Sequence, residues 1–268
     1  MLTLPGVSQG FAPARDSGMP VTQMLTNLGP ELGAFLSPRE ESSYDAVQVI
    51  DGKPCRGEAR IVTARVDYTK DFYTAASWPR GQKPLTPALE QTVHLSISTD
   101  AGSQSTMTTV ALDAAKPAHA LKLTTSVQSS AGIATSQFQL WRTPPKQLYH
   151  SPRDGEGTGE RVLDERPEAH FEEELPLLLR GLDFRSALEG TFFLYDSQIG
   201  AATPAPTPWP ARFTVRDEAG HWKVTVEVAD GRMIEYDFAA APPHALLLFR
   251  HSDGRSLTLR PEKLPDGT

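Results

Sequence analysis

The chain is poor in cysteine, with Cys55 as the one thiol in 268 residues. A single thiol excludes an intrachain disulfide and any metal site built from several cysteines. Cys55 follows a turn signal, and Lys53 and Arg56 nearby favour its thiolate form. A nucleophile also needs a histidine close in space, which sequence order does not supply. We therefore expect Cys55 to be a small turn or packing residue, with a catalytic role as the alternative.

Clusters of positive charge and long apolar runs are absent as well. The formal net charge is −7, and the basic residues are scattered singly among acidic ones. Binding to a nucleic-acid backbone needs grouped Lys and Arg side chains that displace counterions, so no nucleic-acid partner is predicted. No apolar stretch approaches the ~20 residues that cross a bilayer as a helix, so no transmembrane segment is predicted.

The first residues, Met1-Leu-Thr-Leu-Pro-Gly6, lack the basic start and apolar core of a secretory signal. Two cellular compartments are compatible with this observation. The protein is cytoplasmic if the sequence starts where the natural protein starts. It belongs in the periplasm or cell envelope if a signal peptide has been removed.

The 23 prolines and 20 glycines disfavour long helices, so short strands are expected instead. In the segment 91–99, Val93, Leu95 and Ile97 alternate with polar residues, which is the period of a strand with one buried face. Further strands are expected at 106–112, 121–127, 135–141, 191–195, 211–216, 221–229, 232–238, 245–250 and 256–260. The predicted fold is mainly β: a large curved antiparallel sheet, as a half-barrel or two abutting β lobes.

One short helix is expected near residues 171–180. The carboxylates of Glu172-Glu-Glu174 stand where the free N–H groups of a first helical turn favour negative charge. An apolar run starting at Leu175 follows, and Gly181 ends it.

Composition divides the chain into four parts. Residues 1–43, rich in Pro and Gly, are predicted to form an irregular arm. Residues 44–150 form a β lobe, 151–167 a Gly-rich linker or loop, and 168–264 the short helix with a second β lobe.

The clearest hairpin signal is Asp230-Gly231, which predicts a two-residue type I′ turn with positive φ at both positions. Asp253-Gly254 repeats the signal. A turn at Asp230-Gly231 would fix the register of its strands and place two apolar rows on one face. The predicted ligand-binding residues are the members of these rows: Trp222, Val224, Val226, Tyr236 and Phe238. If the helix near 175–182 covers this face, the same residues form a core instead.

Signals for catalysis are weak. His170 and Glu174 stand four residues apart, a spacing that one helical turn brings together, and imidazole and carboxylate are both metal ligands. No His-Glu-x-x-His pattern occurs, and an acidic helix start explains the glutamates without a metal. The glycines at 155, 157 and 159 are flanked by the negative charges of Glu156 and Glu160. They therefore predict a flexible loop and not a phosphate-binding loop. No catalytic residue, metal site or cofactor is predicted.

Three segments carry a resemblance: Tyr44-Asp-Ala-Val-Gln-Val-Ile-Asp-Gly-Lys-Pro-Cys-Arg-Gly-Glu-Ala-Arg-Ile61, Leu175-Pro-Leu-Leu-Leu-Arg-Gly-Leu182 and Pro243-His-Ala-Leu-Leu-Leu-Phe-Arg-His-Ser-Asp-Gly-Arg-Ser-Leu257. Together they look like an uncharacterised "domain of unknown function" family of exported bacterial proteins. The likeness covers about residues 44–260. It implies a highly curved antiparallel sheet in an envelope protein, similar in style to carriers that shelter lipid in a half-barrel, and it transfers no catalytic residue.

The expected function is therefore non-enzymatic: a bacterial envelope protein that binds an apolar ligand or a protein partner. Two alternatives stay open from the residues alone. One is a hydrolase that uses Cys55 or a His170/Glu174 site, and the other is a structural or assembly component that uses its strand edges. The sequence specifies neither the ligand nor the oligomeric state.

Overall fold

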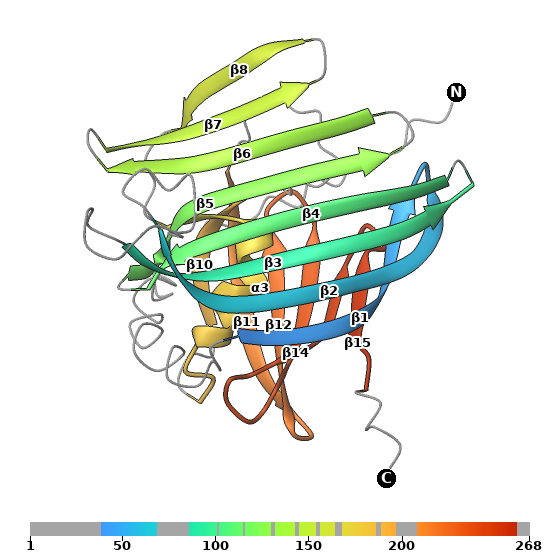
Figure 1. The fold of residues 1–268 in the computed structure, drawn as a ribbon. Helices are drawn as coiled ribbons and strands as arrows, with labels where there is room; N and C mark the ends of the chain where they lie inside the picture. Colours follow the sequence, from blue (N-terminus) through green and yellow to red (C-terminus); the bar gives the residue numbers. More distant parts are fainter. Residues whose placement is uncertain are drawn as a thin grey trace, which may run out of the picture.

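The computed structural model describes residues 39–68, 86–100, 102–114, 116–129, 132–142, 145–153, 156–163, 168–185, 189–196 and 208–261. Its strands form a single 15-stranded sheet in the order β8-β7-β6-β5-β4-β3-β2-β1-β15-β14-β13-β12-β11-β10-β9 (Figure 1). All pairs are antiparallel except β9 with β10. The predicted fold class is confirmed, and the two abutting lobes of the expectation are two halves of one sheet.

The sheet is two meanders joined along one seam. The first half contains β1 (Arg39–Ile50), β2 (Lys53–Tyr68), β3 (Thr86–Thr99), β4 (Gly102–Asp113), β5 (Lys116–Ser129), β6 (Gly132–Arg142), β7 (Pro145–Arg153) and β8 (Glu156–Leu163). The second half contains β9 (Ala169–Phe171), β10 (Glu189–Tyr195), β11 (Trp209–Glu218), β12 (His221–Val228), β13 (Met233–Ala239), β14 (Leu246–His251) and β15 (Ser256–Leu259). At the seam β1 pairs with β15, from Tyr44 opposite Leu259 to Val47 opposite Ser256.

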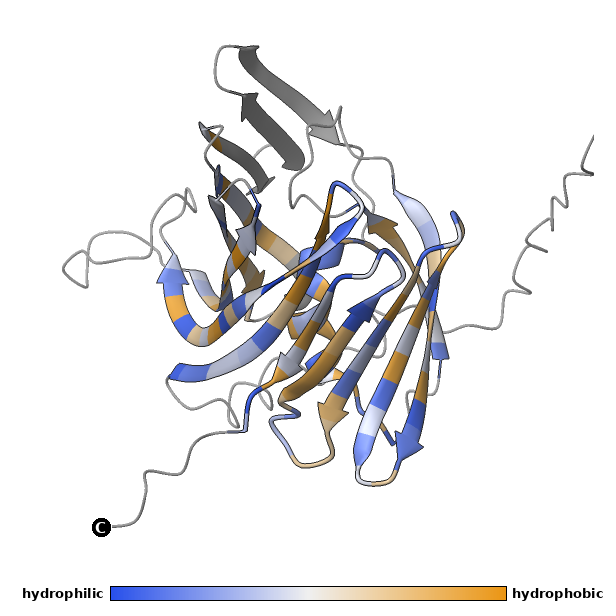
Figure 2. Ribbon diagram, turned by 90° about the vertical axis from the view of Figure 1, so that its right-hand side faces the viewer, coloured by the Kyte–Doolittle hydropathy of each residue, from blue (hydrophilic) through white to orange (hydrophobic). Residues whose placement is uncertain are grey.

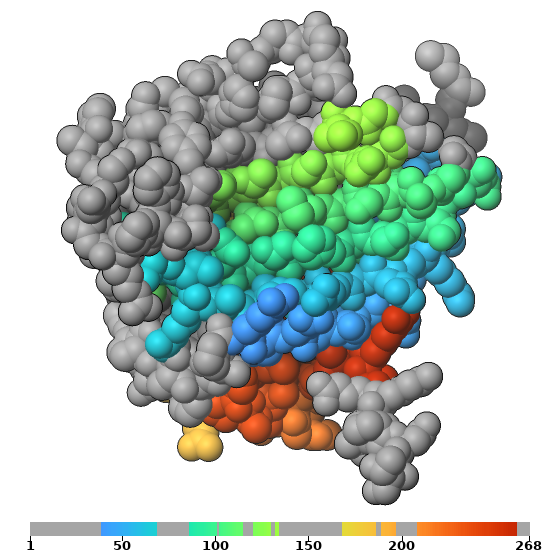
Figure 3. Space-filling view, in the orientation of Figure 1, coloured from blue at the N-terminus to red at the C-terminus, as the bar shows by residue number. Residues whose placement is uncertain are grey.

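Strong curvature brings the two halves face to face. In Figure 1, β2, β3 and β4 cross the front of the molecule while β11, β12 and β14 lie behind them in a different direction. Hydrophobic and hydrophilic residues alternate along the coloured strands in Figure 2, so these strands have one inward and one outward face. Figure 3 shows the outer surface of β1 to β5 as one continuous layer. The apolar faces of both halves meet in one core cluster that includes Ile61, Leu89, Val110, Phe213 and Val226.

The predicted short helix is present and lies inside the folded sheet. It runs as a 3₁₀ turn at Glu172–Glu174 (η3), an α-helical turn at Leu175–Leu178 (α3) and a 3₁₀ turn at Leu179–Gly181 (η4). Leu175, Leu177, Leu178 and Leu179 have no exposed surface. A segment that is apolar on all sides needs partners on all sides, and the two halves of the sheet provide them.

An ion pair ties the end of this helical segment to the first strand. The Nη2 of Arg180 lies 2.8 Å and 3.1 Å from the two carboxylate oxygens of Glu40 on β1. Its Nε donates a hydrogen bond to the carbonyl oxygen of Pro243 at 3.0 Å. Arg180 is buried, so these three bonds satisfy a guanidinium that has lost its water.

Two boundaries differ from the sequence prediction. Strand β1 starts at Arg39 and not near residue 44, and β8 lies within the segment 151–167 that was expected to be a linker or loop. β8 is an edge strand that pairs only with β7, and edge positions tolerate the glycines that suggested a loop. Residues 1–38 of the predicted arm lie outside the described residues. The division into domains at the predicted boundaries stays a prediction.

The turn at Asp230-Gly231 also differs from the sequence prediction. At Asp230-Gly231 only the glycine has positive φ, and the N–H of Val228 bonds to the carbonyl of Arg232. This is a three-residue loop with glycine in the left-handed position, and not the predicted type I′ turn. Two-residue turns with positive φ at both positions occur instead at Asp51-Gly52 and at Ala219-Gly220. The two apolar rows still share one face, because Trp222 lies opposite Phe238 and Val224 opposite Tyr236. The three-residue loop sets this register, which is shifted by one residue from that of a two-residue turn.

The curvature of β2 depends on Gly57. This residue lies between Ala46 of β1 and Ile97 of β3, and a Cβ at its position would be 1.9 Å from the carbonyl oxygen of Ser96. That oxygen belongs to the backbone and has no rotamer by which to move away. Any side chain at this position forces β2 and β3 apart where the sheet bends.

We predict that Gly57→Ala lowers the free energy of unfolding by about 1–3 kcal/mol, the usual cost of overpacking. Urea denaturation followed by circular dichroism measures it. The matched control is Arg56→Ala, which changes the adjacent, exposed residue of the same strand and should leave the midpoint unchanged. Equal midpoints for Gly57→Ala and the parent protein would contradict the close approach of the strands.

Candidate ligand-binding pocket

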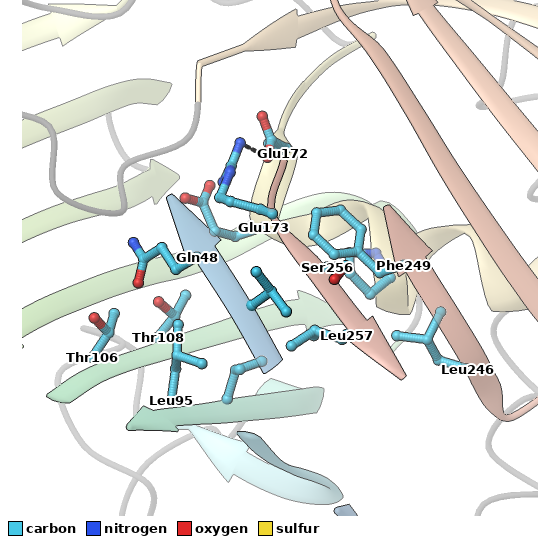
Figure 4. Close-up of a pocket in the computed structure, with 14 residues that line it drawn as sticks. Gln48, Leu95, Thr106, Thr108, Glu172, Glu173, Leu246, Phe249, Ser256 and Leu257 are labelled. Atoms are coloured by element: carbon cyan, nitrogen blue, oxygen red, sulfur yellow. Dashed lines mark ion pairs between the residues drawn. The ribbon is translucent and has the colours of Figure 1, made fainter. Parts of the chain in front are cut away.

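A hollow opens on the concave side of the sheet, where the two halves and the helical segment meet (Figure 4). The space in it that can hold the centres of water-sized atoms is about 90 Å³, and all the empty space between its walls, open solvent included, is about 770 Å³. The residues that line it come from β1, β3, β4, η3, α3, β14 and β15: Val47, Gln48, Val93, Leu95, Thr106, Thr108, Glu172, Glu173, Pro176, Leu246, Phe249, Arg255, Ser256 and Leu257.

One wall combines apolar and uncharged polar side chains from the first half of the sheet. Val93 of β3 lies opposite Thr108 of β4, and Leu95 lies opposite Thr106. Gln48 of β1 adds an amide to the same wall, as Figure 4 shows. Both threonines and Gln48 are buried, whereas Val93 and Leu95 keep part of their surface exposed. This wall is therefore apolar along β3 and hydrogen-bonding along its two flanks.

The opposite wall is apolar. Phe249 of β14 lies opposite Leu257 of β15, and both side chains are only partly buried. On its other side, the ring of Phe249 packs against the ring of Tyr236, with the ring centroids 5.5 Å apart. Leu246 continues this wall toward the end of the pocket away from the glutamates (Figure 4). These side chains contact the core on one side and the hollow on the other.

The end of the pocket nearest η3 is charged. Glu172 is 5% exposed, and its Oε1 lies 2.8 Å from the Nη2 of Arg255. The Nη1 of Arg232 is 3.6 Å from the Oε2 of Glu172, and the Nε2 of His251 is 3.7 Å from it. A carboxylate removed from water needs such partners, and Glu172 has a cation at each oxygen.

Two similar hairpins supply the two arginines. In each, the sequence Asp-Gly-Arg forms the turn: residues 230–232 join β12 to β13, and 253–255 join β14 to β15. In both, an aspartate oxygen accepts the backbone N–H of the arginine at 3.0 Å, and the arginine Nε lies 2.6 Å from the other oxygen. The aspartates thus hold both guanidinium groups in position beside Glu172.

Burial and these charges shift the pKa of three neighbouring groups. Burial lowers the pKa of His251 below its ordinary value of 6.5, although the nearby carboxylate of Glu172 opposes this. The Nδ1 of His251 accepts the N–H of Asp253 at 3.0 Å, which suits a neutral ring. Burial and then Glu172 raise the pKa of Tyr236 well above its usual range. Burial acts to raise the pKa of Asp253, but the backbone bond and charge of Arg255 outweigh it, so this pKa is lowered.

The sequence-predicted site residues lie beside the pocket and do not line it. Val224, Val226, Tyr236 and Phe238 have no exposed surface and belong to the core. Trp222 is partly buried and stacks on Phe184, with ring centroids 5.6 Å apart. The segment from Phe171 to Phe184 covers this face. A ligand-binding role for these five residues stays a prediction.

The other candidate residues do not line the pocket, although Cys55 lies opposite Gln48 on the neighbouring strand. The Nδ1 of His170 lies 3.1 Å from the Oε2 of Glu174, so the spacing of four does bring these side chains together. Both are buried, and Glu174 also accepts the N–H of Phe171 at 3.1 Å, which makes it part of the helix start. The thiol of Cys55 contacts the carbonyl oxygen of Lys53 at 3.7 Å. Within the described ranges, no group of three or more potential metal ligands forms a site.

Sequence reasoning missed the residues that line the hollow. Gln48 and Leu257 fall within quoted segments of the family resemblance, yet nothing local distinguishes them from ordinary strand residues. One signal was available: Asp-Gly-Arg occurs at both hairpins, and two such turns near an acidic helix start indicate paired arginines for a buried glutamate.

Comparisons with known proteins add likenesses of fold. No protein-family model matches the chain, and the search of curated proteins gave no match. A beta-barrel-like protein of domain of unknown function DUF1849 from Brucella abortus is similar with a TM-score of 0.46 and 13% identity, over 84% of this chain and 96% of that chain. A DUF1089 family protein from Pseudomonas aeruginosa has a TM-score of 0.38 and 15% identity, over 65% and 94%. Neither assigns a role to a residue of this chain. In the part of the chain that the structure describes, no helix is long and apolar enough to span a membrane.

The charged end of the pocket predicts how stability depends on pH. The pKa of His251 is lower in the folded protein than in the unfolded chain, so the unfolded chain binds more protons once the pH falls below about 6.5. The stabilising contribution of the neutral ring is therefore present above that pH and is lost as the pH falls toward the folded pKa.

We expect the urea midpoint to fall between about pH 7.5 and about pH 5.5, and His251→Gln to reduce this fall. The control is His94→Gln, which alters an exposed histidine of β3 and should keep the full pH dependence of the parent protein. A fall of the same size in the parent and in His251→Gln would show that the ring is not the group responsible.

Proposed function

We propose that this protein is a non-enzymatic binding protein of the bacterial cell envelope that holds a small apolar or amphiphilic molecule in the hollow between the halves of its sheet. The observation that carries the proposal is the partial exposure of Val93, Leu95, Phe249 and Leu257 inside a concave site. Apolar surface gathered in a hollow is the usual lining of a small-molecule site.

The contrast with the neighbouring core supports this reading. Over β12 and β13 the concave face is covered by the helical segment, and Val224, Val226 and Tyr236 there have no exposed surface. Between β3 and β14 no such cover exists in the described part of the chain, although Val93, Leu95, Phe249 and Leu257 are apolar as well. A bound ligand would cover the apolar side chains between β3 and β14, as Leu175 to Leu179 cover those of β12 and β13.

The chemistry of the lining favours binding over hydrolysis. Its hydroxyl groups belong to Thr106, Thr108 and Ser256, and among the described residues no hydrogen bond joins any of them to a histidine. His251 lies near the charged end, and its Nε2 is 3.7 Å from the Oε2 of Glu172, but no hydroxyl of the lining is hydrogen-bonded to this nitrogen in the described residues. An activated nucleophile needs a base within hydrogen-bond distance, and this lining has none in place. Assignment to the cell envelope rests on the sequence resemblance.

Titration with diphenylhexatriene, a hydrocarbon fluorophore without polar groups, tests the proposal. We expect saturable binding by the parent protein and at least ~10-fold weaker binding by Leu257→Asp, because a carboxylate in the apolar wall must be desolvated when the ligand enters. Met107→Asp is the matched control, since Met107 is 43% exposed on β4 and does not line the pocket. Thermal melts establish that each variant is folded.

Two results would contradict the proposal: no saturable binding by the folded parent protein, or equal loss of binding in Leu257→Asp and Met107→Asp. Substitution of Phe238 is unsuitable for this purpose. Its side chain has no exposed surface, so a carboxylate there would test folding and not binding.

A further inference from the structure

The polar side chains on the β1, β3 and β4 wall of the pocket share one property, which is that none of them carries a charge. They are Gln48, Thr106 and Thr108, and all three are buried. Thr108 has its hydroxyl 3.3 Å from that of Thr125 on β5, outside the pocket. The wall can therefore form hydrogen bonds without a formal charge.

Gln48 is the member of this wall that lacks a partner. Its side chain is 9% exposed, and its Oε1 has no hydrogen-bond partner among the described residues. The amide points into the hollow beside Thr106 and Thr108 (Figure 4). A buried amide without a partner is unfavourable, and a ligand group that bonds to it would remove that penalty.

The charged end of the pocket disfavours a charged head group of either sign. Both guanidinium groups there are already engaged, Arg255 by Glu172 and Asp253, and Arg232 by Asp230 and Asp196. A ligand carboxylate would lie near Glu172 and Glu173 without a cation of its own. A ligand ammonium would compete with the arginines that balance Glu172.

We infer that the ligand is a single-chain amphiphile with an uncharged, hydrogen-bonding head such as an alcohol or an amide. The head lies against Gln48, with Thr106 and Thr108 beside it, and the chain lies against Leu257 and Phe249. This inference rests on the proposed function, because it names the ligand class of the same pocket.

The experiment compares three ligands of equal chain length that differ only in the head: decan-1-ol, decanoate and decylamine. Each displaces bound diphenylhexatriene, and each is also titrated directly by calorimetry, so the comparison does not depend on the fluorophore. We expect decan-1-ol to bind at least ~10-fold more tightly than either charged ligand, because a charged head must be desolvated without a free partner.

Variants of Gln48 test the position of the head. Gln48→Leu keeps the size of the side chain and removes the amide, so it should weaken decan-1-ol binding about 10-fold and leave diphenylhexatriene binding unchanged. Gln48→Glu places a carboxylate at the same atoms and should shift the preference toward decylamine. Gln128→Leu is the matched control, because Gln128 is an exposed amide on β5.

The outcomes separate this inference from the proposed function. Diphenylhexatriene binding with equal or tighter binding of decanoate or decylamine would overturn the inference and leave the proposed function standing. Unchanged decan-1-ol affinity in Gln48→Leu would do the same. If neither the fluorophore nor decan-1-ol binds the folded parent protein, the proposed function and the inference both fail.

Discussion

The arrangement of this molecule depends on one buried carboxylate. Glu172 starts the helical segment, and it is held inside the folded sheet by arginines from two hairpins. A buried ion pair contributes little net stability, but removing one partner leaves an unpaired charge, which costs about 3–5 kcal/mol. The pairing therefore matters chiefly because it permits few arrangements. The segment from Glu172 to Gly181 must enter the sheet where both Asp-Gly-Arg turns can reach its first residue.

The other end of the same segment is fixed independently. Arg180 reaches across to Glu40 at the start of β1, so the helical segment is tied to the second half of the sheet at its beginning and to the first half at its end. Between these two ion pairs lie the four leucines that fill the core. The hydroxyl of Tyr44 bonds to the carbonyl of Leu246 at 3.0 Å and adds a buried link across the β1–β15 seam. The pocket lies next to this fixed segment, so its charged end has a defined position.

Local patterns predicted the parts of the fold that are set by neighbours in sequence. The alternation in β3 and β12, the shared face of Trp222 and Phe238, and the short helix at Leu175 all follow from period and composition. The pocket could not be predicted in this way, because its walls come from strands in the two halves of the chain, which face each other only when the sheet curves. Gln48 follows Val47 on a strand with no unusual feature. Its amide faces a hollow only because the sheet curves. The turn at Asp230-Gly231 was assigned the wrong type because Asp-Gly is compatible with both two- and three-residue loops.

The concave face explains why the hollow stays open beside a filled core. Along β2 to β5 this face carries buried polar side chains that bond to their neighbours within the sheet: Thr63 to Gln91, and Thr108 to Thr125, each at 3.3 Å. Bonds directed along the sheet leave little to attract the opposite half, whereas leucines at these positions would draw the two halves together as they do around Leu178. The buried uncharged polar side chains lie on the wall of β1, β3 and β4, so closing the gap would press Phe249 and Leu257 against hydroxyl and amide groups that they cannot satisfy. The hollow thus has one wall with hydroxyl and amide groups and one wall with Phe249 and Leu257, and the two ends of the amphiphile that we propose match this division.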